Sequence, residues 1–196
     1  MQHTHFTTTL ISEIHELNQS FVELMLRAYR GGDFALDPVL AKALDQPDRV
    51  LPQCPFLLFR PVERADDDVS VVLRANDDFA QGLVVATLTL LRQLAREDLP
   101  TVRLLTGESV RWCRTLAALT PSELVRLAPR LDLKPRLVDV SGFWQDLVRA
   151  RGVSRLQRAS LGATGLQLVL SRPRRFVPID AFRSQSGFRP EVHDES

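Results

Sequence analysis

The sequence predicts a mainly α-helical protein with short strands and a C-terminal helix-turn-helix-like segment. Two long stretches, 7–30 and 77–97, repeat apolar residues every three or four positions, which is the spacing of an amphipathic helix. Several shorter stretches begin with a capping residue followed by proline, as short helices do. Apolar residues make up 44% and charged residues 25% of the 196 residues, as is typical of a soluble globular protein.

The first predicted helix covers Thr7–Arg30 and ends at Gly31-Gly32, where glycine allows the chain to leave the helix. Its apolar positions alternate steps of four and three, as in a heptad seam along one face. The seam consists of Leu10, Ile14, Leu17, Phe21, Leu24 and Ala28. We predict that the seam from Leu10 to Leu24 forms an oligomer interface. The alternative is that this helix packs on its own domain.

A short helix and a strand complete the first half of the chain. The predicted helix Asp37–Leu44 begins with an aspartate cap and Pro38, a favourable helix start. Cys54–Phe59 is apolar without alternation, which predicts a strand that is buried on both faces or paired across an interface. We therefore assign Phe56 and Phe59 to the predicted oligomer interface.

The second half repeats this order around a helical insert. Its long helix is predicted at Asp77–Glu97, and the apolar face of that helix is predicted to be Phe79, Leu83, Ala86, Leu90 and Leu94. The shorter elements that follow are predicted helices at Pro100–Leu105, Val110–Leu119 and Glu123–Ala128, and a strand at Leu131–Val140.

The polar connection Arg60–Asn76 is the best boundary between the two halves, although Val69–Leu73 within it could add a strand. We predict an N-terminal half unit over 1–75 and a second unit with the basic segment over 76–175. A tail, 176–196, follows. The repeated order of long helix, proline-started helix and strand indicates an imperfect internal duplication.

The C-terminal stretch Ser141–Arg175 has the pattern of short helices joined by tight turns. The turn Ser160-Leu161-Gly162 contains a glycine that permits the positive φ of a helix-turn-helix corner. The next helix, near Ala163–Leu170, would present Thr164 and Gln167 outward. This arrangement suits a DNA-reading helix, and it equally suits an ordinary helical hairpin with a solvated basic face.

Basic charge is concentrated in the same region. Residues 146–190 contain nine arginines and two acidic residues, a net charge of +7, whereas the whole chain has a net charge of +1. A basic segment made entirely of arginine is expected of a phosphate-binding surface. We predict that Thr164 and Gln167 contact base edges. The residues predicted to bind phosphate groups are Arg155, Arg158, Arg172, Arg174 and Arg175.

The sequence lacks the usual marks of an enzyme. It has no glycine-rich phosphate loop, no serine nucleophile elbow and no metal-binding pair of histidines, so we expect no catalysis, cofactor or metal. Cys54 and Cys113 have no zinc-site spacing and are expected to be buried thiols in a reducing cytoplasm. We expect neither a signal peptide nor a membrane span.

The segment from Leu83 to Leu170 resembles FlhD, a subunit of the bacterial flagellar master regulator. Two consecutive motifs are similar to the central core of that family, and later residues are similar to its C-terminal helices. An N-terminal stretch is similar to its first helix. The residues that carry the resemblance are 115–120 (TLAALT), 124–128 (LVRLA), 91–98 (LRQLARED), 14–21 (IHELNQSF), Val153, Leu156, Gln157, Gly162 and Leu166.

The resemblance implies a mostly helical activator subunit that acts with a zinc-binding, FlhC-like partner and recruits RNA polymerase. Related regulators serve conjugative plasmids and integrative elements. This chain is longer than a single FlhD and has the opening helix twice, so one chain could imitate a dimer. We therefore predict a cytoplasmic transcriptional activator that binds double-stranded promoter DNA. The alternative is a protein–protein adaptor that binds a partner through its first helix and the strand ending at Phe59.

Overall fold

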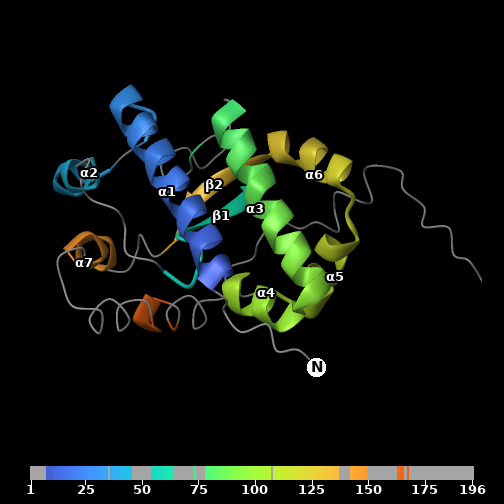
Figure 1. Ribbon diagram of the computed structural model, residues 1–196. Helices are drawn as coiled ribbons and strands as arrows, with labels where there is room; N and C mark the ends of the chain where they lie inside the picture. The colour runs from blue at the N-terminus through green and yellow to red at the C-terminus, as the bar shows by residue number, and fades with distance from the viewer. Residues whose placement is uncertain are drawn as a thin grey trace, which may run out of the picture.

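The computed structural model describes residues 8–34, 36–45, 54–63, 73, 78–106, 108–136, 142–149, 163–165 and 167. This part of the chain is mainly helical, with one small two-stranded antiparallel sheet (Figure 1). The predicted fold class is confirmed at this level. The helices are α1 (Thr8–Gly31), α2 (Pro38–Leu44), α3 (Asp78–Glu97), α4 (Leu99–Thr106), α5 (Val110–Ala118), α6 (Pro121–Leu127), the 3₁₀ helix η1 (Ala128–Arg130) and α7 (Phe143–Arg149); the strands are β1 (Phe59–Glu63) and β2 (Leu131–Pro135).

The helices begin where local capping signals predict. The Asp37 carboxylate accepts a hydrogen bond from the Leu40 N–H at 2.9 Å, directly before α2. The Ser109 hydroxyl accepts one from the Trp112 N–H at 3.1 Å before α5. Thr120 and Glu123 form a complete capping box at the start of α6. Each of these caps pairs a backbone N–H that the helix itself leaves without a partner.

The long helices α1 and α3 lie side by side in opposite directions across one face of the sheet (Figure 1). Phe21 of α1 stacks on Phe59 of β1, with ring centroids 4.6 Å apart. Leu88 and Leu91 of α3 are fully buried in the same core. The core thus lies between this helix pair and the sheet, where both helices bury their apolar faces.

The sheet joins the two halves of the chain. Strand β1 pairs antiparallel with β2, with Pro61 opposite Leu133 at the centre of the register. Leu73 exchanges backbone hydrogen bonds with Leu133 at 2.8 and 2.9 Å, at the other edge of β2. The two strands therefore run antiparallel to each other, as do the two long helices α1 and α3 (Figure 1).

The first strand lies later in the chain than predicted. Cys54–Leu58 was expected to be its start, but these residues are irregular, and β1 begins at Phe59. The reason is the buried side chain of Asn18 in α1. Its Nδ2 donates to the Phe56 carbonyl at 3.0 Å, and its Oδ1 accepts from the Leu58 N–H at 2.8 Å. Because one amide pairs both backbone groups, the segment is buried without a strand partner.

The buried face of α3 and the end of β2 differ from what the sequence predicts. The predicted face of α3 was partly wrong, because Ala86 is exposed while Val84 and Thr87 are buried. α3 contacts α1 as well as α4, α5 and α6, so its buried sector is wider than one stripe. Strand β2 begins at Leu131 as predicted, but the described strand ends at Pro135, and 137–140 lie outside the described residues.

Arg136 connects the end of the sheet to α4. Its Nη1 donates to the Leu105 carbonyl at 2.8 Å and its Nη2 donates to the Thr106 carbonyl at 2.9 Å. Burial, and then the charge of Arg60, lower the pKa of this guanidinium to about 9, so it stays protonated at neutral pH. The buried cation therefore satisfies the carbonyls at the C-terminus of α4 and complements the helix dipole.

Among the helices that the structure describes, none has both the length and the apolar character that crossing a bilayer requires.

Substitution of Asn18 tests how much the 56–58 segment contributes to stability. In Asn18→Ala, the Phe56 carbonyl and the Leu58 N–H lose their partner while buried, so we expect a loss of about 2–4 kcal/mol in the free energy of unfolding. Urea denaturation measures it. The control is Gln93→Ala on the exposed face of α3, which should change stability by less than about 0.5 kcal/mol. Equal effects of the two substitutions would contradict the anchoring role of Asn18.

Candidate nucleic-acid interface

The predicted base-reading residues lie on a helical turn at the surface. Ala163, Thr164, Gly165 and Gln167 are helical, as the sequence predicts. The side chains of Thr164 and Gln167 are exposed, whereas Gly165 is buried. The turn therefore presents polar side chains outward while its backbone is fixed on the protein, which is the geometry that a reading helix requires.

Gly165 allows this close packing. A Cβ atom at this position would lie 2.5 Å from Cζ of Phe56 and 3.0 Å from Cε2 of Phe143. The centroids of the two phenylalanine rings lie 6.3 Å apart, and neither residue is more than 4% exposed. Only glycine leaves room for the helix backbone against these rings, because any other side chain would overlap them.

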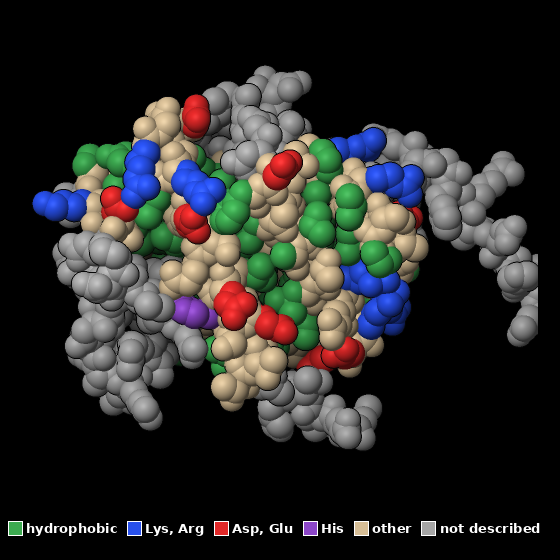
Figure 2. Space-filling model, turned by 45° about the horizontal axis from the view of Figure 1, so that its top comes forward, with side chains coloured by type: hydrophobic (Ala, Val, Ile, Leu, Met, Phe, Trp, Pro, Cys, Tyr) green, Lys and Arg blue, Asp and Glu red, His purple; other side chains and the backbone are tan. Residues whose placement is uncertain are grey.

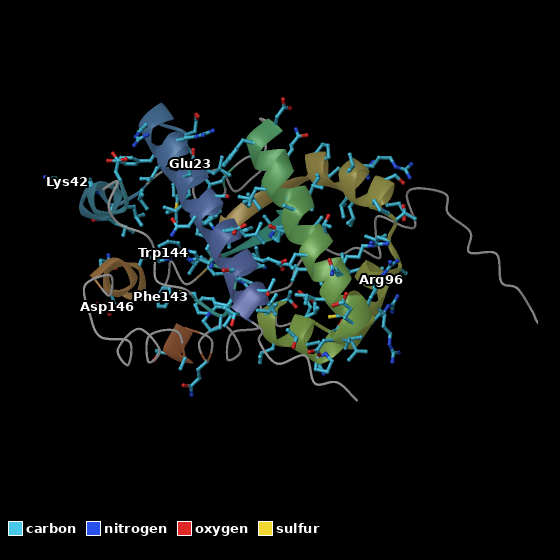
Figure 3. The ribbon with its side chains drawn as sticks, viewed as in Figure 1. Glu23, Lys42, Arg96, Phe143, Trp144 and Asp146 are labelled. Carbon is cyan, nitrogen blue, oxygen red and sulfur yellow. The ribbon has the colours of Figure 1, made fainter. Side chains whose placement is uncertain are left out.

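The rings themselves are held from two directions. Phe56 belongs to the segment that Asn18 anchors, and Phe143 begins α7, which packs against α2. Trp144, the next residue of α7, donates its indole N–H to the Arg136 carbonyl at 3.0 Å. Figure 3 shows Phe143 and Trp144 on the side of the molecule formed by α2 and α7. The exposed turn thus rests on a part of the core that α1, α2 and the end of β2 fix together.

The five arginines predicted to bind phosphate lie outside the described residues. They are Arg155, Arg158, Arg172, Arg174 and Arg175. Their role stays a prediction from the concentration of basic charge around Thr164 and Gln167.

The residues predicted to form an oligomer interface lie in the core of this chain. Leu17 is partly buried and packs against that core. The structure accounts for the apolar seam of α1 without a second chain, as in the alternative that the helix packs on its own domain. An interface through these residues would require the core to open. The residues that are at most 5% exposed are Leu10, Ile14, Phe21, Leu24, Phe56 and Phe59.

Burial shifts the pKa values of Cys54, Cys113 and His15 toward their neutral forms. Burial raises the pKa of Cys54 to about 12 and that of Cys113 to about 11, so both thiols stay protonated at neutral pH. Burial lowers the pKa of His15, which favours its neutral form. The described residues include no group of three or more His, Cys, Asp or Glu side chains arranged to hold a metal ion.

The sequence interpretation missed a second gathering of arginines, on the helices of the other half of the molecule. Figure 2 shows Lys and Arg side chains on the side formed by α5 and α6, as well as at the opposite end of the molecule. The available signal was spacing, since these arginines occur in pairs three or four residues apart, with no exposed acidic residue between 110 and 130. We call this set the arginine surface; it consists of Arg92, Arg96, Arg111, Arg114, Arg126 and Arg130.

Two alanine substitutions at glycine test the packing of the exposed turn. We expect Gly165→Ala to lower the free energy of unfolding by about 1–3 kcal/mol, because the new methyl group overlaps buried aromatic rings. The matched control is Gly82→Ala in α3, where a Cβ meets nothing within 4 Å; this substitution should raise stability by about 0.5–1 kcal/mol. Thermal unfolding measures both.

A double-substitution cycle tests whether the ring of Phe56 causes the loss of stability in Gly165→Ala. In a Phe56→Leu background, the shorter side chain leaves room for the added methyl group, so Gly165→Ala should cost less there than in the unmodified protein. An equal cost in both backgrounds would show that the turn does not rest on Phe56.

Comparisons of the chain with protein-family models, with curated proteins and with solved structures find no match. The resemblance to FlhD therefore stays a prediction that depends on the short motifs quoted above.

Proposed function

We propose that this protein is a DNA-binding transcriptional activator subunit of FlhD-like type. The observation that carries the proposal is the helical turn on which Thr164 and Gln167 are exposed while Gly165 is packed against Phe56 and Phe143. A polar pair on a rigidly supported helix can enter the major groove without losing the conformational entropy of a mobile loop.

Gln167 and Thr164 have the chemistry that base recognition requires. A glutamine side chain can pair bidentately with adenine through its N6 and N7, and a threonine can donate to or accept from several base edges. The surrounding segment supplies arginines for the neighbouring phosphates, with nine arginines and two acidic residues between 146 and 190. Phosphate contacts would position the turn, and the two side chains would add sequence preference.

The proposed partner subunit and the proposed contact with RNA polymerase are inferred from the resemblance to FlhD. It implies a zinc-binding, FlhC-like second subunit and recruitment of RNA polymerase at promoter DNA. The antiparallel relation of α1 to α3 and of β1 to β2 supports the idea that one chain takes the place of two smaller subunits. A single chain of this kind would offer its partner two related but unequal halves.

The described surface gives less support to the adaptor alternative. An adaptor needs an exposed apolar patch as the centre of its interface. The apolar seam of α1 and the rings of Phe56 and Phe59 are buried. Among the residues that the structure describes, Val125 is the one large hydrophobic side chain that is strongly exposed.

The test of base reading is the substitution Gln167→Ala. With a promoter fragment selected from genomic DNA, we expect this variant to lose about 1–3 kcal/mol of binding free energy, roughly 5- to 150-fold in affinity, while its affinity for scrambled DNA stays the same. Fluorescence anisotropy at several salt concentrations measures both, with and without proteins encoded next to this one.

The control for base reading is Gln93→Ala, an exposed helical glutamine on α3, which should change neither affinity. An equal loss of affinity of Gln167→Ala for selected and scrambled DNA would contradict the base-reading role. Absence of DNA binding by the unmodified protein, alone and with its neighbours, would contradict the proposed function as a whole.

A second substitution tests phosphate binding in the same segment. Arg158→Gln should weaken binding to all DNA sequences alike, because a phosphate contact does not distinguish bases. The slope of log affinity against log salt concentration should become shallower by about one. A sequence-dependent loss in this variant would instead assign Arg158 to base recognition.

A further inference from the structure

The surface formed by α5, α6 and η1 has charge of one sign. Between 110 and 130, all residues of which are described, the charged side chains at the surface are arginines, and the one carboxylate, Glu123, is buried in the cap of α6. Of the acidic residues that flank this range, Asp132 is buried and Glu108 is partly buried. The exposed arginines are Arg111, Arg114, Arg126 and Arg130.

Two arginines of α3 extend this surface and are held in place. The Nε of Arg96 donates to the Ala117 carbonyl at 2.8 Å, and the Nε of Arg92 donates to the Leu119 carbonyl. Both carbonyls lie at the C-terminal end of α5, so the cations also complement the dipole of that helix. Each guanidinium uses its Nε for this contact, and its terminal nitrogens are further hydrogen-bond donors.

From α1 to Asp45, the exposed charged side chains have both signs: six are acidic and three are basic. Figure 3 shows Glu23 and Lys42, one residue of each sign, on the far side of the molecule from Arg96. The insert that supplies α4 and α5 lies between α3 and α6 and has no described counterpart between α1 and α2. Arg111 and Arg114 belong to this insert, whereas the other arginines of the surface lie on α3, α6 and η1.

The composition of the surface favours a nucleic-acid backbone over an acidic protein. Protein interfaces centre on buried aromatic or aliphatic anchors, and here the described surface has only Val125 as a large exposed apolar side chain. Interfaces with DNA are more polar and much more positive. Arginines also match phosphate oxygens in pairs, which suits a row of phosphates spaced along a duplex.

We propose that the arginine surface binds the phosphate backbone of double-stranded DNA, at a position separate from the 163–167 turn. In Figure 1 the orange turn lies below α7, and α5 and α6 lie at the other side of the molecule. The inference rests on the proposed function, because it assigns a second, sequence-independent contact to the same DNA-binding protein. Such a contact strengthens binding to every sequence and leaves the choice of sequence to Thr164 and Gln167.

The test uses the full chain and a fluorescently labelled duplex of random sequence. The variant Arg114→Gln, Arg126→Gln and Arg130→Gln removes one arginine from each of α5, α6 and η1. The control variant Arg27→Gln, Arg30→Gln and Lys42→Gln removes the same charge from exposed positions of α1 and α2. Anisotropy is measured over a range of salt concentrations, and urea denaturation checks that both variants are folded.

We expect the first variant to make the slope of log affinity against log salt shallower by about three, with a loss of roughly 10²–10³-fold in affinity at 0.1 M salt. The control variant should keep the slope of the unmodified protein. Should the triple variant fail to fold, the single reversal Arg114→Glu replaces it and should lower affinity for random DNA by at least about tenfold.

An unchanged salt slope in the folded variant would overturn the inference. So would loss of binding to labelled poly-glutamate with unchanged binding to DNA, because that result assigns the surface to an acidic protein. Failure of the proposed function looks different: the unmodified protein would then bind neither selected nor random DNA. A third result would reject only the arginine surface: Gln167→Ala loses its preference for the selected DNA, but the arginine variant keeps the salt slope of the unmodified protein. The proposed function would then still stand.

Discussion

The structure depends on the two hydrogen bonds that Asn18 makes with the backbone of Phe56 and Leu58. A buried irregular segment is unfavourable unless its polar groups are paired, and here one amide side chain, 1% exposed, pairs both. The segment then positions Phe59 to stack on Phe21 at the start of β1, and the Leu58 carbonyl accepts a hydrogen bond from the Arg136 N–H at 2.7 Å. Through these contacts α1, β1 and the end of β2 hold one another in place.

The same anchor supports the candidate interface. Asn18 holds the backbone of Phe56, and the ring of Phe56 lies against Gly165, so the exposed turn at Thr164 packs on an anchored part of the core. The packing leaves no room for a methyl group at Gly165, and this lack of space gives the turn a defined position. A reading helix needs such rigidity because base contacts lose their discrimination when side chains are displaced.

The two halves of the chain pack around one core and differ in their surfaces. Antiparallel pairing of β1 with β2 and of α1 with α3 brings the halves around one core. The second half contains the inserted helices α4 and α5, and its surface at α5, α6 and η1 presents arginines, whereas the first half presents carboxylates together with Arg27, Arg30 and Lys42. The exposed charge therefore differs between the two ends of the described molecule, which would orient a polyanion toward the arginine surface.

The sequence by itself determined the helices, because their signals are local. Asp37, Ser109 and Thr120 cap helices within three residues of themselves, and the spacing of apolar residues marked the buried faces approximately. The exposure of Thr164 and Gln167 followed from the same helical spacing. Only the tertiary structure decided where β1 begins, why residue 165 is glycine, and that the arginines of α3, α5, α6 and η1 lie on one side. Each of these depends on contacts between residues far apart in the chain: Asn18 lies 38 residues before Phe56, and Arg96 lies 21 residues before Ala117. The periodicity of a single segment contains no information about such partners.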